Sequence, residues 1–182
     1  TVVYLVCVVT LSLYAIATLV LIVLYLLRRR RITPTAPLTE FPKVVVQLPI
    51  YNERMVVARL IDAAAALDYP ADRLTIQVLD DSTDDTTWIA AAKAAEWSAR
   101  GVNIQHIRRG SRDGFKAGAL AHGLSITDAE YAAVFDADFV MPPDFLRQML
   151  AVLVDQPTIA CVQARWGHLN PFDNPLTQMQ TL

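Results

Sequence analysis

This sequence contains few cysteines and has a small net charge. The two cysteines, Cys7 and Cys161, lie in separate apolar runs with no CxxC or Cys/His spacing, which argues against a disulfide framework and against a zinc site. The formal net charge is only −2, with acids and bases mixed beyond the first quarter of the chain, so nothing supports a nucleic-acid partner. Internal repeats and low-complexity segments are also missing, and 182 residues leave room for one soluble domain.

Charge is absent altogether from residues 2–27, a stretch long enough to cross a bilayer, which needs about 20 apolar residues. A cleaved signal peptide is the competing interpretation, but its apolar core would be about 7 to 15 residues with basic residues before it. Here four arginines, residues 28–31, follow the stretch instead. We therefore expect a transmembrane helix over residues 1–27, with the N-terminus outside and the rest of the chain in the cytoplasm.

The chain beyond this stretch predicts an α/β fold. Residues 28–42 are basic and rich in Pro, which is typical of a linker, and residues 43–182 form the expected domain. Short β-branched runs alternate there with longer helical patterns, which implies βαβ crossovers and a mainly parallel sheet with helices on both faces. The strands are expected at 43–48, 74–79, 102–107, 131–135 and 158–164, and the helices at about 54–67, 84–100, 116–126 and 143–155.

Polar loops follow the first four of these strands. Ligands of open α/β sheets bind beyond the carboxyl ends of the strands, so the loops "PIYNE", "DDSTDD", "RRGSRDGFK" and "DAD" should meet at one edge. Tyr51 offers a flat face that either stacks on a nucleobase or packs on the domain surface. Asp81, at the end of a strand, either accepts a hydrogen bond from a nucleobase or belongs to a polar run that only caps the next helix. Its neighbours Ser82, Thr83 and Asp84 are alternatives for capping the following helix, which would explain only one or two of these polar residues.

Two carboxylates, Asp136 and Asp138, end the fourth strand. Side chains at i and i+2 of an extended chain point to the same side, and two like charges there repel unless a cation lies between them. All-oxygen ligands suit Mg²⁺ or Mn²⁺, and such a metal could bridge a diphosphate. The alternative is that the strand has emerged into solvent and the aspartates begin a polar loop.

Lys116 lies at the start of a predicted helix, where the helix dipole disfavours a cation by a few tenths of a kcal/mol. A diphosphate held between this lysine, the helix N-terminus and a metal on the aspartate pair would explain the position of the lysine. A solvated basic loop is the simpler alternative.

Taken in order, "VVVQLPIYNE", "LDYPADRLTIQVLDDSTDDT", "GFKAGAL", "FDADF" and "VQARW" resemble family 2 glycosyltransferases of the GT-A fold. The resemblance is to the membrane-bound cellulose-synthase-like branch with the mannan and glucomannan synthases, and it covers about residues 43–182. It implies that the nucleotide base lies at Tyr51 and Glu53 and is recognised by Asp81, and that Lys116 contacts the diphosphate. It also implies a DxD pair in which Asp138 is the direct metal ligand and Asp136 contacts the ribose and the metal.

The resemblance further implies an inverting transfer of a hexose from UDP-glucose or GDP-mannose to a growing β-linked polysaccharide, at a plasma, inner or Golgi-type membrane. The chain opens on Thr1 without Met and ends in a helix-like stretch, so we expect an N-terminal fragment that is inactive alone. The general base and the acceptor-binding motif are then expected beyond Leu182. A nucleotidyltransferase would have a Gly-rich loop where "PIYNE" stands, and an inactive nucleotide-sugar-binding partner or sensor subunit is the remaining alternative.

Overall fold

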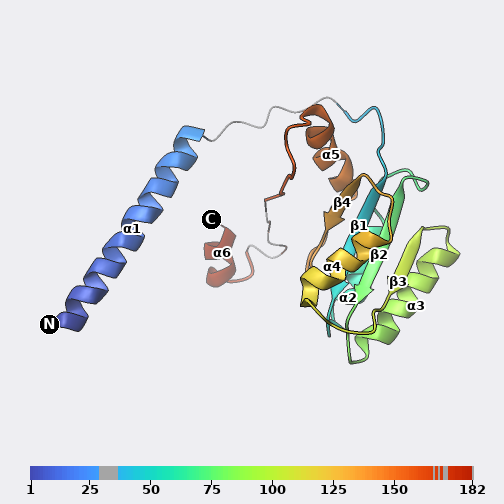
Figure 1. The fold of residues 1–182 in the computed structure, drawn as a ribbon, viewed down its shortest axis with the longest axis horizontal. Coiled ribbons are helices and arrows are strands. Elements are labelled where there is room, and N and C mark those ends of the chain that lie inside the picture. Colours follow the sequence, from blue (N-terminus) through green and yellow to red (C-terminus); the bar gives the residue numbers. More distant parts are fainter. Residues whose placement is uncertain (29–36, 166, 168, 170–171, 182) are drawn as a thin grey trace. The chain divides into compact units, whose positions relative to one another are not determined.

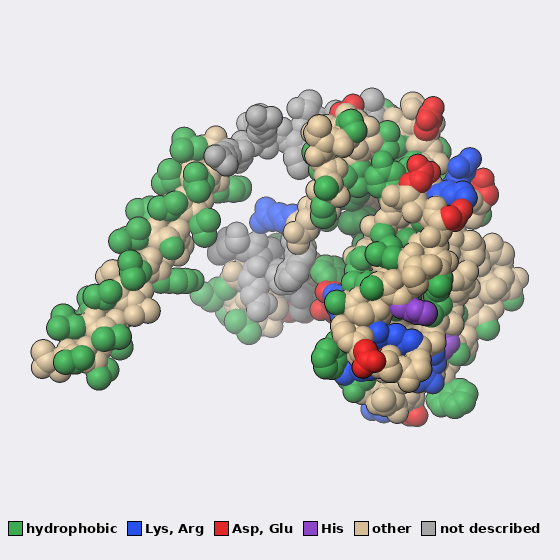
Figure 2. All heavy atoms as spheres, in the orientation of Figure 1, with side chains coloured by type: hydrophobic (Ala, Val, Ile, Leu, Met, Phe, Trp, Pro, Cys, Tyr) green, Lys and Arg blue, Asp and Glu red, His purple; other side chains and the backbone are tan. Residues whose placement is uncertain are grey.

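The computed structural model describes residues 1–28, 37–165, 167, 169 and 172–181, and the chain divides into two compact units, Thr1–Pro34 and Thr35–Leu182. The first unit contains the helix α1 (Val2–Arg28), whose side chains are hydrophobic along its length (Figure 2). Val2–Leu27 span 26 residues and are long and apolar enough to cross a membrane, as the sequence predicts. Residues 29–36, which hold most of the predicted basic linker, lie outside the described residues.

The second unit is built on a parallel sheet with the strand order β3-β2-β1-β4 (Figure 1). All three neighbouring pairs of strands are parallel, which confirms the predicted α/β fold. The strands are β1 (Val44–Ile50), β2 (Leu74–Asp80), β3 (Ile104–Ile107) and β4 (Tyr131–Val134), and the helices are α2 (Val57–Ala65), α3 (Thr86–Ala99), α4 (Phe115–Ser125), α5 (Phe145–Asp155) and α6 (Pro175–Thr181).

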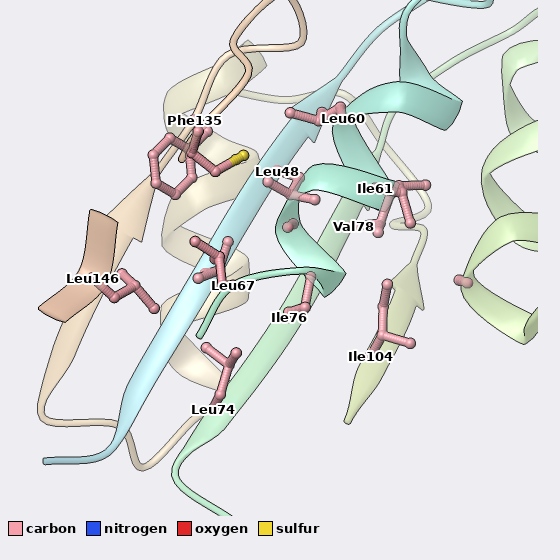
Figure 3. Packing of buried hydrophobic residues seen from close by; sticks show 14 of the residues in the cluster. Leu48, Leu60, Ile61, Leu67, Leu74, Ile76, Val78, Ile104, Phe135 and Leu146 are labelled. Atoms are coloured by element: carbon pink, nitrogen blue, oxygen red, sulfur yellow. The ribbon is translucent and has the colours of Figure 1, made fainter. Parts of the chain in front are cut away.

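In the main hydrophobic core, buried residues of α2, α3 and α5 pack with those of the sheet (Figure 3). Alternate residues of a strand share one face, so every second residue of β1 and β2 points into this core. The buried residues of α2 recur at intervals of three and four, which places them on one stripe facing the strands. Burying each large aliphatic side chain contributes roughly 1.5–3 kcal/mol. The cluster includes Val44, Val46, Leu48, Ile50, Ile76 and Val78 from the sheet, Leu60 and Ile61 from α2, and Leu146 from α5.

The opposite face of the sheet holds α4 against two buried glutamines. Gln47 of β1 and Gln77 of β2 are register partners, and the Gln47 amide donates to Gln77 Oε1 at 3.0 Å and to the Leu120 carbonyl at 3.3 Å. The Gln77 amide donates to the Gly123 carbonyl at 3.1 Å. A Cβ at Gly123 would lie 2.4 Å from Gln47 Nε2 and 2.6 Å from Gln77 Oε1, so this glycine lets α4 sit directly on the sheet.

One predicted strand is wrong. Residues 158–164 form no strand, although their β-branched pattern favours one. A strand needs a neighbour to pair its backbone groups, and within the described part of the chain β4 pairs with β1 alone. The Ile159 N–H instead donates to the Gln156 carbonyl in a turn at 2.9 Å. The local β-branched pattern is therefore not enough to form a strand, because the described residues contain no strand with which it pairs.

Candidate nucleotide-sugar site

The four polar loops meet at the carboxyl edge of the sheet around a pocket of about 340 Å³. All six residues for which the sequence predicts a role line this pocket, and so does Arg112, for which it predicts none. Apolar residues from the strand ends and from α4 form the rest of the wall. The polar lining residues are Tyr51, Glu53, Asp81, Arg112, Lys116, Asp136 and Asp138.

Asp81 is held by a bidentate ion pair with Arg109. Arg109 Nε lies 2.8 Å from one carboxylate oxygen of Asp81, and a terminal guanidinium nitrogen lies 2.6 Å from the other. The side chains are only 13% and 8% exposed, respectively, and the hydrogen bond to Asp81 raises the pKa of Arg109. Paired charges with this geometry are specific in direction as well as strong, so Arg109 fixes the orientation in which Asp81 faces the pocket.

Arg109 also shapes the loop that leads into α4. It donates to the Asp113 carbonyl at 2.7 Å and to the Phe115 carbonyl at 2.8 Å. The backbone turns there through Gly114, at φ 69°, and through Phe115, at φ 49°, a region that non-glycine residues rarely adopt. A Cβ at Gly118 would lie 2.0 Å from the Asp113 carbonyl oxygen. The loop is therefore closed on itself, and its shape determines where α4 begins.

The polar run after β2 ties two strand ends together. Asp80 is buried, and its carboxylate accepts from the Ser82 N–H at 2.8 Å and lies 2.9 Å from His106 Nε2. Burial alone would raise the pKa of Asp80, but the hydrogen bonds from His106 and Ser82 lower it to about 2. Ser82 Oγ in turn accepts from the Asn52 N–H at 3.0 Å, and Asn52 Oδ1 accepts from the Thr83 N–H at 2.9 Å. These contacts fix the loop after β1 relative to the loop after β2.

This network corrects part of the capping prediction. Ser82 and Thr83 bind Asn52 and do not cap α3, because the helix begins further along the chain, at Thr86. Asp84 does accept a hydrogen bond from the Thr86 N–H, at 3.0 Å. The run therefore contains so many polar residues because they join two loops as well as starting a helix.

Asp136 and Asp138 follow β4 on one side of the chain. The strand ends at Val134, but burial continues to alternate beyond it: Phe135 and Ala137 are buried, while both aspartates line the pocket. The Phe139 N–H then donates to the Asp136 carbonyl at 3.1 Å and turns the chain. The expectation that the two carboxylates share one side is thus confirmed, although they lie in a turn and not within the strand.

Lys116 forms an ion pair with Asp136. About half of each side chain is exposed, so solvent screens the pair and it contributes little to stability. Lys116 lies in the first turn of α4, where the helix dipole disfavours it. The structure therefore places a cation beside the carboxylate pair, and this cation is a lysine of the chain itself.

Tyr51 presents its ring to the pocket with Arg112 stacked on it. The guanidinium carbon of Arg112 lies 3.3 Å from the centroid of the Tyr51 ring and 5.1 Å from that of Phe115. Asn52, the next residue, has a φ of 58° and turns the chain sharply after β1. The side chain of Glu53 lines the pocket, and its carbonyl accepts from the N–H groups of Val56 and Val57 at 3.0 Å.

Sequence reasoning missed the partners of Arg109 and Arg112. Both belong to the basic loop that the sequence singles out, but Asp81 and Tyr51 lie far from them along the chain. A bidentate arginine needs a carboxylate and a stacked arginine needs a ring. The loop sequence contained the arginines, and only the parallel order of the strands shows which loop each one faces.

Comparison with known proteins shows to which family this sequence is similar. The model of the family described as Glycosyl transferase family 2 matches residues 45–180. Glucomannan 4-beta-mannosyltransferase 2 of Arabidopsis thaliana is 46% identical over 148 residues, which are 79% of this chain and 28% of that protein. Glucomannan 4-beta-mannosyltransferase 1 of Oryza sativa subsp. japonica is 42% identical over 153 residues, 82% of this chain and 29% of that protein. The chain therefore spans less than a third of the length of these curated relatives.

Two solved structures share the fold. The mannosyltransferase PcManGT from Pyrobaculum calidifontis, in complex with GDP-Man and Mn²⁺, matches with a TM-score of 0.61 and 29% identity, over 74% of this chain and 40% of its own. TarS of S. aureus, residues 1–349 in complex with UDP, matches with a TM-score of 0.54 and 21% identity, over 72% of this chain and 40% of its own. At that identity, the second likeness concerns the fold alone.

Proposed function

Because this chain belongs to glycosyl transferase family 2, we propose that residues 43–182 bind the nucleotide sugar of a hexosyltransferase that extends a β-linked polysaccharide. The observation that carries the proposal is the pocket at the carboxyl edge of the sheet. It gathers an aromatic ring, a partly buried carboxylate, a lysine and a carboxylate pair from four separate loops. A nucleoside diphosphate sugar presents a flat base, ribose hydroxyls and a charged diphosphate, and each has a chemical counterpart in this lining.

The base end of the pocket is formed by Tyr51, Glu53 and Asp81. Stacking on the Tyr51 ring would bury the flat face of a base. Both oxygens of Asp81 are engaged by Arg109, yet each carboxylate oxygen has more than one acceptor site, so Asp81 retains the capacity to accept an N–H of the base. Arg109 holds this carboxylate in one orientation, which is what recognition of a base edge requires.

The phosphate end is formed by Lys116, Asp136 and Asp138, and these residues fit a divalent cation. Within the described residues no group of three or more His, Cys, Asp or Glu side chains could hold a metal. Mg²⁺ commonly binds through one or two carboxylates together with substrate phosphates and water, so two aspartates are enough. Mg²⁺ or Mn²⁺ held by Asp138 and Asp136 would neutralise charge on the diphosphate as it leaves, and Asp136 would also contact the ribose.

The chain's own residues would act by binding and orientation. Lys116 would leave Asp136 for the diphosphate, where its charge stabilises the departing nucleoside diphosphate. A carboxylate base would take the proton of an acceptor hydroxyl as its oxygen attacks the anomeric carbon, and the bond to the diphosphate would break with inversion. We propose that this base and the acceptor-binding motif come from residues outside this chain, which spans less than a third of the length of its curated relatives.

We propose GDP-mannose as the preferred donor, ahead of UDP-glucose. Support comes from the two plant relatives, which are named as glucomannan mannosyltransferases, and from PcManGT, whose structure holds GDP-Man and Mn²⁺. We also propose that α1 crosses a membrane of plasma, inner or Golgi type, with the donor site on the cytoplasmic side. Its uncharged length and the arginines after it support this orientation.

Calorimetric titration tests the donor site directly. The chain, reconstituted with α1 in nanodiscs, should bind GDP-mannose more tightly than UDP-glucose, and only when Mn²⁺ or Mg²⁺ is present. Asp138→Ala should abolish the metal-dependent part of binding without changing the fold. Asp128→Ala is the matched control, because Asp128 is exposed and pairs with Lys43 away from the pocket.

The outcomes separate the parts of the proposal. Unchanged donor binding in Asp138→Ala would refute the metal assignment, and absence of binding by the unaltered chain would refute the donor site. Labelled mannose from GDP-mannose should enter polymer in membranes that carry the whole protein. Donor binding without such incorporation would favour an inactive partner subunit.

A further inference from the structure

The stacking face of Tyr51 is already occupied by a side chain of the protein. The guanidinium of Arg112 lies 3.3 Å above the centre of the Tyr51 ring, which is the spacing of direct stacking. Tyr51 is 39% exposed, and both residues line the pocket. A planar base cannot stack on the same face of Tyr51 while the guanidinium remains there.

We propose that Arg112 gates the base subsite: its guanidinium covers the face of Tyr51 when the site is empty and is displaced by the nucleobase of the donor. The inference rests on the proposed function, since it assumes that a nucleotide binds at Tyr51. It adds a residue that sets the affinity for the base and to which no role is assigned by the motifs in the sequence. The ligand class is the nucleoside half of a nucleoside diphosphate sugar.

Arg112 is the cation best able to move, because the neighbouring cations are held by hydrogen bonds or ion pairs. Arg109 makes four hydrogen bonds, to Asp81 and to two carbonyls. Arg108 donates to the Ser82 carbonyl at 2.9 Å, and Lys116 pairs with Asp136. Within the described part of the chain, the side chain of Arg112 makes no hydrogen bond and no ion pair, and its guanidinium lies over two aromatic rings. Leaving Tyr51 therefore breaks one stacking contact alone.

The second ring gives the displaced side chain a place to rest. Phe115 begins α4 directly after this loop, its centroid is 5.1 Å from the guanidinium carbon, and the residue is 65% exposed. A small rotation of the Arg112 side chain exchanges one aromatic face for the other. The charge stays beside the pocket during this exchange, so Arg112 opposes the base without opposing the phosphates.

This arrangement predicts that loss of Arg112 strengthens binding of the nucleoside half of the ligand and does not strengthen binding of the diphosphate half. A cation stacked on an exposed ring is held by an amount that corresponds to about two- to fivefold in an equilibrium constant. Arg112→Ala removes this competition, so guanosine and uridine should bind about two- to fivefold more tightly. Pyrophosphate should bind equally or more weakly, because a positive charge has been lost from the pocket.

Ligand-observed NMR titration of the chain in nanodiscs measures these affinities with guanosine, uridine, GDP and pyrophosphate as probes. Arg112→Lys keeps the charge but loses the planar stack, so it should strengthen nucleoside binding as Arg112→Ala does and leave pyrophosphate binding unchanged. In a Tyr51→Leu background, Arg112→Ala should give no gain. Arg100→Ala is the matched control, because Arg100 stacks at 4.7 Å on Trp97 of α3, outside the pocket lining.

The measurements distinguish failure of the Arg112 gate from failure of the proposed donor site. If GDP binds the unaltered chain and Arg112→Ala leaves nucleoside affinity unchanged or lowers it, the gate is wrong and the donor site stands. If Arg112→Ala strengthens nucleoside binding equally in the Tyr51→Leu background, the effect does not come from the Tyr51 face and the gate is again wrong. If neither GDP nor any nucleoside binds the unaltered chain, the proposed function fails and the gate fails with it.

Discussion

Gly123→Ala should destabilise the second unit by about 1 kcal/mol and at most about 2 kcal/mol, although alanine is the better helix former. The added methyl group would lie 2.4 Å from Gln47 Nε2 and 2.6 Å from Gln77 Oε1, both on fully buried side chains. Relieving that overlap by moving the side chains leaves at least one buried polar group without a partner, which costs about 1–3 kcal/mol. Moving the helix instead strains the packing, at about 1–3 kcal/mol. The gain in helix propensity is only about 1 kcal/mol.

Denaturant unfolding followed by tryptophan fluorescence measures this loss. Trp88 and Trp97 lie on α3 of the second unit, and residues 1–34 contain no tryptophan, so the signal does not report on α1. Gly110→Ala is the matched control, because a Cβ there meets nothing within 4 Å. A combined Gln47→Ala and Gly123→Ala variant should lose less stability than the sum of the two changes, since the first removes part of the overlap. A Gly123→Ala protein as stable as the unaltered one would refute the packing argument.

Three further predictions concern the pocket and its support. The pKa of Asp80 falls from 3.8 to about 2 on folding, so the ionised side chain stabilises the fold by on the order of 2 kcal/mol above pH 4, and this stabilisation is lost as the pH falls toward 2. Asp80→Asn should abolish this part of the pH dependence of the unfolding free energy. An unfolding free energy that still falls in the same way below pH 4 in this variant would contradict the prediction. Lys116→Ala should weaken binding of a nucleoside diphosphate about tenfold and leave binding of the nucleoside almost unchanged, because a charge-assisted contact contributes about 1.5 kcal/mol or more. Equal losses of affinity for both ligands in calorimetry would argue against a phosphate contact. Arg109→Lys should weaken nucleoside binding, since an ammonium cannot hold both oxygens of Asp81, and undiminished binding would show that Asp81 needs no such partner.

The sequence predicted the sheet because the strand signal is local. β-branched runs separated by helical patterns located the four strands to within two residues at most ends, and the rule that ligands bind beyond the carboxyl ends of strands brought Tyr51, Asp81, Lys116 and Asp136 into one pocket. The strand expected at 158–164 failed because a strand depends on a partner elsewhere in the chain, which no local pattern reports.

The contacts between distant residues could not be predicted from the sequence either. Gln47 and Gln77 look like ordinary polar positions in two strands, and their pairing beneath Gly123 follows from the register between β1 and β2. The ion pair between Asp81 and Arg109 spans 28 residues. Each partner alone suggests solvent or a ligand, and the alternative that they satisfy each other becomes visible when the strand order is known.

The ion pair of Asp81 and Arg109 also limits how this protein can evolve. A change at Asp81 alone would leave an arginine nearly buried without its counter-ion, and a change at Arg109 alone would free two loop carbonyls as well as the carboxylate. Gly118 is constrained separately, because a Cβ there would lie 2.0 Å from the Asp113 carbonyl oxygen whichever residue stands at position 109. A lineage that acquires a different base preference should therefore change Asp81 and Arg109 together, and substitutions at these two positions should be correlated among descendants of a common ancestor.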